Sequence, residues 1–336
     1  MKGVRAAVVQ AEQPGSLGAG LDRTRELVGE AAGEGAELVV FPETWLPGYP
    51  AWIDYCRDAG LWDHAPVKAV YARLAEDSVA VPGPAAESLA ETAREAGVTL
   101  VVGASERVDA GPGRGTLYNA LLVFGPDGTL LNHHRKLTPT YTERLLWGGG
   151  GTEGLRAVDT PAGRVGGLIC WEHWNPLCRQ ALHESGEDVH VAVWSAVAGV
   201  NNMHQEASRC YAFEARCHVV AAGQLMRASS LPPELEASAE KVVGPDQWLL
   251  RGGSAIIAPD GAYLAGPLYE EPGILVADLD YRRNREESMT LDVAGHYHRP
   301  ELFDFGVRPA ARSASGGGAA HRASGTVNQN SDPPPT

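Results

Sequence analysis

The chain has 336 residues, of which 44% are hydrophobic and 21% are charged, and its formal net charge is −14. This length and apolar content suffice for a sizeable core, in one domain or in two. The acidic balance argues against a surface that binds nucleic acid or anionic lipid, because such polyanions would be repelled. No apolar run approaches the ~20 residues that a membrane-spanning helix needs. We therefore expect a small-molecule partner, with no nucleic acid and no membrane.

Cysteine and histidine usage bears on the compartment and on metal binding. No signal peptide precedes the first apolar segment, and no paired spacing is found among the five cysteines, which are Cys56, Cys170, Cys178, Cys210 and Cys217. This favours free thiols in a reducing cytoplasm over a disulfide framework. Histidines are close together at His133-His134 and at His296 and His298. Because neither a Cys-x-x-Cys nor a His-Glu-x-x-His motif is present, no metal site is expected.

Apolar periodicity and turn residues predict an α/β order of elements. In the first half, strands are expected at 4–10, 37–41, 98–103, 118–124 and 129–136, and helices at 21–33, 67–77 and 85–97. In the second half, strands are expected at 164–170, 189–194, 218–222, 254–258, 262–265 and 273–280, and helices at 176–183 and 203–217. Turns at Gly125-Pro-Asp-Gly128 and Pro259-Asp-Gly261 predict two hairpins. Hairpins within such an order indicate mixed sheets rather than a purely parallel one.

Three of the predicted strands end at residues suited to nucleophilic catalysis. Cys170 ends the apolar run from Arg164 and is followed by a sharp turn, a common way to present a thiol beside backbone N–H groups that stabilise an oxyanion. Glu43 follows a buried strand among Pro, Trp and Tyr residues, where desolvation would strengthen it as a base. Lys136 ends a third strand, with Glu143 seven residues later. Singly, each has an ordinary interpretation, a buried thiol or a surface charge; together they indicate a catalytic set.

The motifs around these residues resemble those of the nitrilase superfamily, and specifically the true nitrilases. They are Phe41-Pro-Glu-Thr-Trp-Leu-Pro-Gly-Tyr-Pro50, His134-Arg-Lys-Leu-Thr-Pro-Thr140, Cys170-Trp-Glu-His-Trp-Asn-Pro-Leu177 and Gly295-His-Tyr-His-Arg-Pro-Glu301. The resemblance covers the chain from Val4 to about Phe305. It implies a four-layer α-β-β-α sandwich, which periodicity alone does not select. It also implies a Glu-Lys-Cys triad in Glu43, Lys136 and Cys170, with Glu143 as a fourth active-site residue.

The resemblance implies hydrolysis of an organic nitrile to a carboxylic acid and ammonia, through a covalent thioimidate on Cys170 and without a cofactor. An alternative is cyanide-hydrolysing, nitrile-hydrating or amide-hydrolysing chemistry with the same triad. A non-catalytic scaffold is disfavoured by the intact triad. The expected substrate-side residues are Tyr49, Trp52, Trp171, His173 and Trp194. Their aromatic character favours an aromatic or arylaliphatic substrate.

Two further residues near these motifs, Glu172 and Gly151, need separate interpretation. Glu172, beside the nucleophile, is expected to anchor the turn through a salt bridge to Arg144 or Arg299 rather than to act in catalysis. The usual Asp after the Trp-Gly pair is absent, with Gly151 near its place. Because glycine adds backbone freedom, we expect a looser loop there.

The organisation expected is a single domain over residues 1–309, with a C-terminal arm at about 291–305 and a disordered tail at 310–336. The tail is rich in Ala, Ser, Gly, Asn and Pro and buries too little apolar surface to offset its ordering entropy. The family resemblance implies a homo-oligomer, a dimer or larger. The segment from Leu291 to Phe305 has no local strand or helix partner in the pattern, so it is expected to reach a neighbouring subunit.

Overall fold

The fold was obtained as a computed structural model, and it describes residues 3–198 and 202–309. Two seven-stranded sheets form its centre. The first has the order β14-β1-β2-β4-β5-β6, with β3 paired to β4. Its strands are β1 (Val4–Gln10), β2 (Leu38–Val40), β3 (Val79–Ala80), β4 (Thr99–Arg107), β5 (Leu117–Phe124), β6 (Leu130–Arg135) and β14 (Gly273–Leu279).

The second sheet has the order β11-β12-β10-β9-β8-β7, with β13 paired to β12. Its strands are β7 (Val158–Thr160), β8 (Gly163–Ile169), β9 (Val189–Trp194), β10 (His218–Gly223), β11 (Leu225–Arg227), β12 (Trp248–Ile257) and β13 (Tyr263–Tyr269). Parallel pairs β8·β9 and β9·β10 lie beside antiparallel pairs such as β10·β12. Both sheets are therefore mixed, as the two predicted hairpins indicated.

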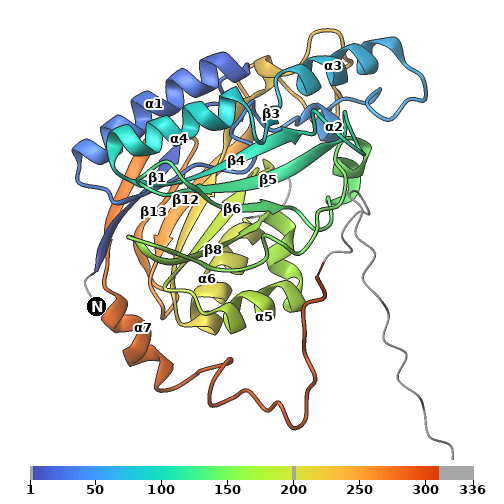
Figure 1. The fold of residues 1–336 in the computed structure, drawn as a ribbon. Coiled ribbons are helices and arrows are strands. Elements are labelled where there is room, and N and C mark those ends of the chain that lie inside the picture. Colours follow the sequence, from blue (N-terminus) through green and yellow to red (C-terminus); the bar gives the residue numbers. More distant parts are fainter. Residues whose placement is uncertain (1–2, 199–201, 310–336) are drawn as a thin grey trace, which may run out of the picture.

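Helices cover the outer face of each sheet. The longest elements against the first sheet are α1 (Leu17–Gly33) and α4 (Pro84–Ala96), and those against the second are α5 (Pro176–Ser185) and α6 (Met203–Ala215). Figure 1 shows α1 and α4 above the sheets and α5 and α6 below them. The remaining helices are α2 (Trp52–Tyr55), α3 (Ala65–Glu76) and α7 (Tyr281–Ser288). The predicted four-layer α-β-β-α sandwich is confirmed.

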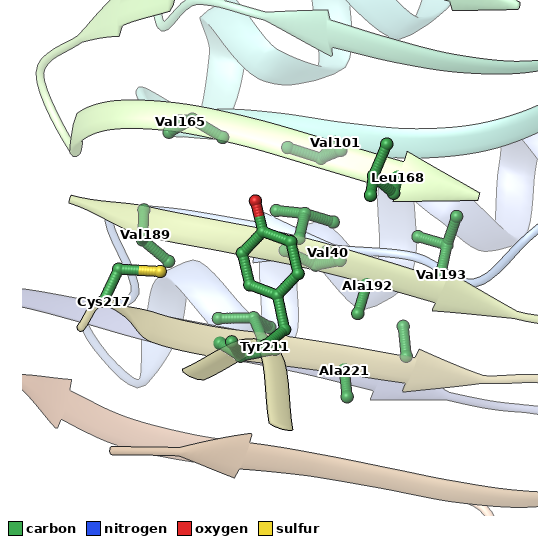
Figure 2. Packing of buried hydrophobic residues seen from close by; sticks show 14 of the residues in the cluster. Val40, Val101, Val165, Leu168, Val189, Ala192, Val193, Tyr211, Cys217 and Ala221 are labelled. Atoms are coloured by element: carbon green, nitrogen blue, oxygen red, sulfur yellow. The ribbon is translucent and has the colours of Figure 1, made fainter. Parts of the chain in front are cut away.

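Alternation along the strands explains the layering. In β1 and β2, Val8 and Val40 pack between the two sheets, whereas Val9 and Val39 pack under α1 and α4. Since successive side chains point to opposite faces of a strand, a strand buried on both faces needs a continuous apolar run. Figure 2 shows Val40 of the first sheet close to the valines of β8 and β9.

Helix boundaries follow from local chemistry. The Ser16 side chain accepts a hydrogen bond from Ala19 N and begins α1 four residues before the predicted start at Leu21. Helix α4 begins with Pro84 and ends at Gly97, whose φ of 67° gives the left-handed cap that the sequence predicted. In α5, Asn175 caps Leu177 N and Pro176 occupies the first turn.

The predicted strands and long helices are all present, most of them with shifted ends. Strand β12 starts at Trp248 rather than at Ser254, and β4 continues to Arg107. The short elements α2, β3, β7 and β11 and helix α7 were not predicted. They have four residues or fewer, except for the polar α7, so apolar periodicity has too few repeats to mark them.

The segment at 291–309 contains no helix or strand, and its apolar side chains Tyr297, Leu302 and Phe303 are exposed. The arm expected at about 291–305 and its contact with a neighbouring subunit stay predictions. The predicted tail at 310–336 lies outside the described residues. Across the described part of the chain, no helix has the length and apolar character needed to cross a membrane.

Candidate active site

The ends of β2, β6 and β8 bring the predicted triad together between the two sheets. Glu43 follows β2 and Lys136 follows β6, both in the first sheet, and Cys170 follows β8 in the second. A close backbone contact positions Glu43. A Cβ atom on Gly103 of β4 would lie 2.3 Å from Pro42 O and 2.8 Å from Glu43 Cα, so only glycine lets the loop approach this strand.

The ammonium of Lys136 is the centre of the site. Its Nζ lies 3.0 Å from Glu43 Oε1 and 2.7 Å and 3.0 Å from the two carboxylate oxygens of Glu143. The Lys136 side chain is 0% exposed. Burial alone would lower the pKa of Lys136, but Glu43 and then Glu143 raise it well above its usual value. The lysine is therefore held as a cation.

The Glu43 carboxylate presents one oxygen without a partner. Asn119 Nδ2 on β5 donates to Glu43 Oε1 over 2.7 Å, and Lys136 donates to the same oxygen. Among the described residues, the buried Oε2 has no hydrogen-bond partner. An unpaired buried carboxylate oxygen is costly in a purely structural site, and it is what a proton acceptor requires.

Cys170 occupies a strained turn. Its φ is 53°, a left-handed conformation that costs a non-glycine residue ~1–2 kcal/mol. The 3₁₀ helix η2 (Cys170–Trp174) starts at this residue, directly after β8. Burial raises the pKa of the Cys170 thiol well above its usual value, the charge of Glu43 raises it further, and Lys136 lowers it. The resting thiol therefore keeps its proton and needs a base to remove it.

Other strained residues surround the same site. Thr44 follows Glu43, Tyr141 begins the 3₁₀ helix η1 (Tyr141–Leu145), and Ala196 follows β9, and all three have positive φ values between 43° and 61°. Such conformations persist where the surrounding structure enforces them, and they cluster at functional sites. Their distribution around Cys170 supports a site built for chemistry.

Glu172 anchors the nucleophile turn, but through partners other than those predicted. Its carboxylate lies 3.0 Å from His134 Nε2 and accepts from the backbone N–H groups of Leu137 at 2.8 Å and Ile169 at 2.9 Å. The predicted salt bridge is wrong, because Arg144 donates to Pro139 O and Arg299 pairs with Glu301. Burial alone would raise the pKa of Glu172, but His134 and these hydrogen bonds lower it. Glu172 thus joins the ends of β6 and β8.

A cavity of about 210 Å³ opens beside Cys170 and Glu143. Of the predicted substrate-side residues, Tyr49, Trp171 and Trp194 line it. The Tyr49 hydroxyl lies 3.3 Å from Glu143 Oε1, so this wall is joined to the triad. The cavity wall is therefore mainly apolar, and Cys170 and Glu143 are among the residues that line it.

Trp52 and His173 lie elsewhere. Trp52 lines a different cavity with Pro50 and Leu74, and it is buried in a cluster around α2 and α3. His173 is buried behind the nucleophile, where Nδ1 lies 2.8 Å from Cys170 O and the ring stacks on Trp194 with centroids 4.6 Å apart. The sequence placed both near the site, but it carries no signal for the direction of an aromatic ring after a strand.

Sequence reasoning missed several groups at the site. Asn119 lies within a strand, Asp54 in the short helix α2, and His204 in the first turn of α6. Asp54 lines the cavity and accepts from Thr142 Oγ1 over 2.6 Å, and burial raises its pKa. A polar residue in the apolar run of β5 was the one available signal for Asn119.

The glycine-rich loop after Trp147 packs closely against β6 at Gly150 and Gly154, while the looser backbone expected at Gly151 stays a prediction. A Cβ atom on Gly150 would lie 2.1 Å from Arg135 O, and one on Gly154 would lie 2.4 Å from His133 O. Gly150 N also donates to Lys136 O over 2.8 Å. These glycines let the loop lie against β6 and hold the end that carries Lys136.

The paired histidines have other partners. His133 lies 2.7 Å from a carboxylate oxygen of Glu106, and His134 contacts Glu172. His298 lies near Glu184. Within residues 3–198 and 202–309, no group of three or more His, Cys, Asp or Glu side chains is arranged to hold a metal ion.

Residues 5–286 match the family described as carbon-nitrogen hydrolase. The chain is 39% identical to a nitrilase from Paraburkholderia phymatum, covering 91% of this chain and 88% of that protein. It is 38% identical to an aliphatic nitrilase from Sinorhizobium fredii, over 92% and 97% of the two chains. It is 37% identical to a bifunctional nitrilase/nitrile hydratase from Lupinus angustifolius, over 91% and 86%.

Solved structures agree on the fold. A carbon-nitrogen hydrolase from Helicobacter pylori superposes with a TM-score of 0.68 at 18% identity, covering 90% of this chain and 99% of that one. An amidase from Nesterenkonia superposes with a TM-score of 0.61 at 19% identity, over 90% and 96%. The chain therefore belongs to the carbon-nitrogen hydrolase family, and its resemblance to the nitrilases is confirmed.

Proposed function

We propose that this protein hydrolyses an organic nitrile to the carboxylic acid and ammonia, with Cys170 as the nucleophile. The observation that carries the proposal is the position of Cys170 beside a largely apolar cavity and the buried Glu43–Lys136–Glu143 cluster. The names of the relatives, which include nitrilases and nitrilase/nitrile hydratases, support a nitrile as the substrate.

The first half of the reaction forms a covalent intermediate. Glu43 Oε2, which has no partner in the described residues, accepts the thiol proton, and Cys170 Sγ attacks the nitrile carbon. One π bond of the nitrile breaks, and its nitrogen takes the proton from Glu43 to give a thioimidate. Lys136 stabilises the charge that develops, and we propose that the N–H of Trp171 donates to the same nitrogen.

Two waters complete the reaction. Glu43 removes a proton from the first water, which adds to the thioimidate carbon, and protonation of the nitrogen releases ammonia and leaves a thioester on Cys170. A second water hydrolyses the thioester to the acid and regenerates the thiol. If the first tetrahedral intermediate instead expels the Cys170 sulfur, the product is an amide. None of these steps requires a cofactor.

Glu143 holds Lys136 rather than moving protons in this scheme. It accepts two hydrogen bonds from Lys136 and one from Thr140 N at 2.7 Å, so both of its oxygens are occupied. The last of these bonds also caps the N-terminus of η1. Glu143 therefore fixes the lysine between two carboxylates.

The cavity favours a nitrile on a small aromatic or arylaliphatic body. An apolar cavity of ~150 Å³ holds benzene, and about 210 Å³ leaves room for one ring with a short extension. The rings of Tyr49, Trp171 and Trp194 supply apolar faces for it. Cyanide is too small to use these contacts, which makes cyanide hydrolysis the weaker alternative.

The first prediction concerns the nucleophile and the substrate together. Cys170→Ala should abolish ammonia release from a panel of aryl, arylalkyl and alkyl nitriles, because the hydroxyl groups that line the same cavity, such as that of Ser195, are far weaker nucleophiles than a thiolate. Cys210→Ala, at an exposed position, and Cys178→Ala, in the core, are the controls and should retain activity. Ammonia from cyanide or simple amides, with none from any organic nitrile, would reject the nitrilase assignment.

The second prediction concerns the charged cluster. Glu43→Gln and Lys136→Ala should each lower kcat by at least about a hundredfold, the scale for losing a base or an oxyanion donor. Lys136→Arg should not restore activity, because a planar guanidinium does not fit the place of a compact ammonium between two carboxylates. Glu270→Gln, which removes an exposed surface carboxylate, is the control. Near-normal kcat in Lys136→Arg would show that charge alone suffices.

We further propose that the protein is a homo-oligomer, a dimer or larger, in a reducing compartment such as the cytoplasm. Large apolar side chains are exposed next to the site, on η1, η2 and α5: Tyr141, Leu145, Trp171, Trp174 and Leu177. A patch of this kind is unusual on a monomer. The five cysteines all carry free thiols, which supports the compartment.

The third prediction tests this assembly. Ending the chain before Leu291 should reduce both oligomer size and activity, because the arm and its exposed Tyr297 and Phe303 are removed. Ending it at residue 309 should leave both nearly unchanged. Light scattering and kcat on the same samples decide the matter. A fully active monomer, or inactivity after loss of the tail alone, would contradict the proposal.

A further inference from the structure

A buried chain of hydrogen bonds runs from the nucleophile turn into the second sheet. His173 Nδ1 lies 2.8 Å from Cys170 O, and His173 Nε2 lies 3.0 Å from His190 Nε2. His190 Nδ1 lies 2.8 Å from Glu187 Oε1, and Tyr211 OH lies 2.5 Å from Glu187 Oε2. The side chains of His190 and Glu187 are at most 1% exposed, and His173 and Tyr211 are equally buried. The chain takes no part in the reaction steps above.

The direction of these hydrogen bonds fixes the number of protons in the chain. A carbonyl oxygen only accepts, so His173 Nδ1 must carry a proton. The contact between the two Nε2 atoms needs one proton, and so does the contact between His190 Nδ1 and Glu187 Oε1. Two neutral imidazoles and a carboxylate supply only two protons for these three contacts. One additional proton must therefore reside on this chain, whichever atom holds it.

The surroundings indicate where that proton resides. Burial lowers the pKa of His173 to about 3 and that of His190 well below its usual value, so both imidazoles are neutral. Burial raises the pKa of Glu187 to about 7. When both rings are neutral, His173 Nδ1 donates to Cys170 O and His190 Nε2 donates to His173 Nε2. His190 Nδ1 then accepts a hydrogen bond from the Glu187 carboxylic acid. Tyr211 then donates to the other oxygen of the acid.

The groups around Glu187 are consistent with a neutral acid. His183 from α5, His190 from β9, Tyr211 from α6 and Cys217, which precedes β10, face it. Burial raises the pKa of Glu187 by more than the Tyr211 hydrogen bond and the charge of His183 lower it. On the β8 side, a Cβ atom on Gly166 would lie 1.8 Å from Glu187 Oε1, so glycine makes room for the carboxyl group. Among these described neighbours there is no Lys or Arg to balance a carboxylate. Figure 2 shows the Tyr211 ring lying against the strands of this sheet, close to Val189.

We propose that Glu187 is a positioning residue, a neutral carboxylic acid whose proton maintains the hydrogen bond from His173 to the Cys170 carbonyl and so fixes the nucleophile turn. This role rests on the proposed function of Cys170. Loss of the proton leaves one contact in the chain with two lone pairs facing each other within about 3 Å. The His173 ring, which stacks on the cavity wall at Trp194, then loses its fixed orientation.

The sign of the pH effect follows from the raised pKa of Glu187. Between the usual value of 4.5 and about 7, the folded chain binds this proton more strongly than the unfolded chain does. The protonated acid therefore makes its full contribution to the free energy of unfolding below pH 4.5, and this contribution is lost as the pH rises through about 7. The turn should loosen over the same range.

Infrared difference spectroscopy of the full chain tests the proton directly, without any substrate. The wild-type minus Glu187→Gln spectrum at mildly acidic pH should contain the carbonyl band of a protonated carboxylic acid, which disappears as the pH is raised. Glu214→Gln is the matched control, because Glu214 pairs with Arg179 at 2.7 Å and should contribute only carboxylate bands. A carboxylate band for Glu187 across the whole range would overturn the proposal.

Reactivity of Cys170 tests the consequence. Glutamine keeps an N–H for His190 and a carbonyl for Tyr211, so Glu187→Gln should stay within about threefold of wild type in kcat, whereas Glu187→Leu should lose about tenfold or more. We expect the kcat of the wild type to fall as the pH rises through about 7 and that of Glu187→Gln not to fall. Alkylation of Cys170 by iodoacetamide, measured by mass spectrometry of its peptide, should occur at a similar rate in the wild type and Glu187→Gln and at a different rate in Glu187→Leu. This readout works even if the protein turns over no nitrile. If Glu187→Leu alkylates and titrates like the folded wild type, Glu187 does not position the turn.

Discussion

The buried ammonium of Lys136 is the interaction on which the arrangement of the site depends. Three charged groups lie together with almost no solvent exposure, at Nζ to oxygen distances of 2.7–3.0 Å. Each charge is tolerable only because the others are present, and removing one partner from such a set costs ~3–5 kcal/mol. The end of β2, the end of β6 and helix η1 must therefore converge. Gly103 and Gly150 permit that convergence by removing side chains from the two close backbone contacts.

The nucleophile is held from two sides. On one side, Glu172 accepts from the backbone at the ends of β6 and β8 and thereby ties Cys170 to the strand that carries Lys136. On the other side, His173 binds the Cys170 carbonyl and leads to Glu187. The left-handed φ of Cys170 is maintained between these two anchors. Residues that never touch a substrate thus determine where the sulfur lies.

The order of the elements and the reactive set could be predicted from local patterns in the sequence, whereas the four-layer sandwich was implied by the family resemblance. Apolar runs buried on two faces marked β1 and β9 to the residue, and three strand ends carried Glu43, Lys136 and Cys170. Partners across the fold could not be predicted. Glu172 was expected to pair with Arg144 or Arg299, yet its actual partners are a histidine on β6 and two backbone amides. Such pairings depend on the packing of the two sheets, which no spacing in one segment encodes.

Ring direction is the other property that the sequence does not specify. Trp171, His173 and Trp194 were all expected to face the substrate, but His173 points into the second sheet and supports Trp194 from behind. Asp54 shows the reverse case, a polar residue in a short helix that reaches the cavity. The directions of the His173 ring and of the Asp54 side chain both depend on which face of their segment is covered by the adjacent sheet or helix.

The central claim is that the nitrile carbon becomes bonded to Cys170 during turnover. Rapid acid quenching of the wild-type protein with an arylalkyl nitrile, followed by peptide mass spectrometry, tests it most directly. We predict that the Cys170 peptide gains the mass of the thioimidate or of the acyl group, and that the other cysteines remain unmodified. Steady release of ammonia with no adduct on Cys170, or with an adduct on another residue, would contradict it.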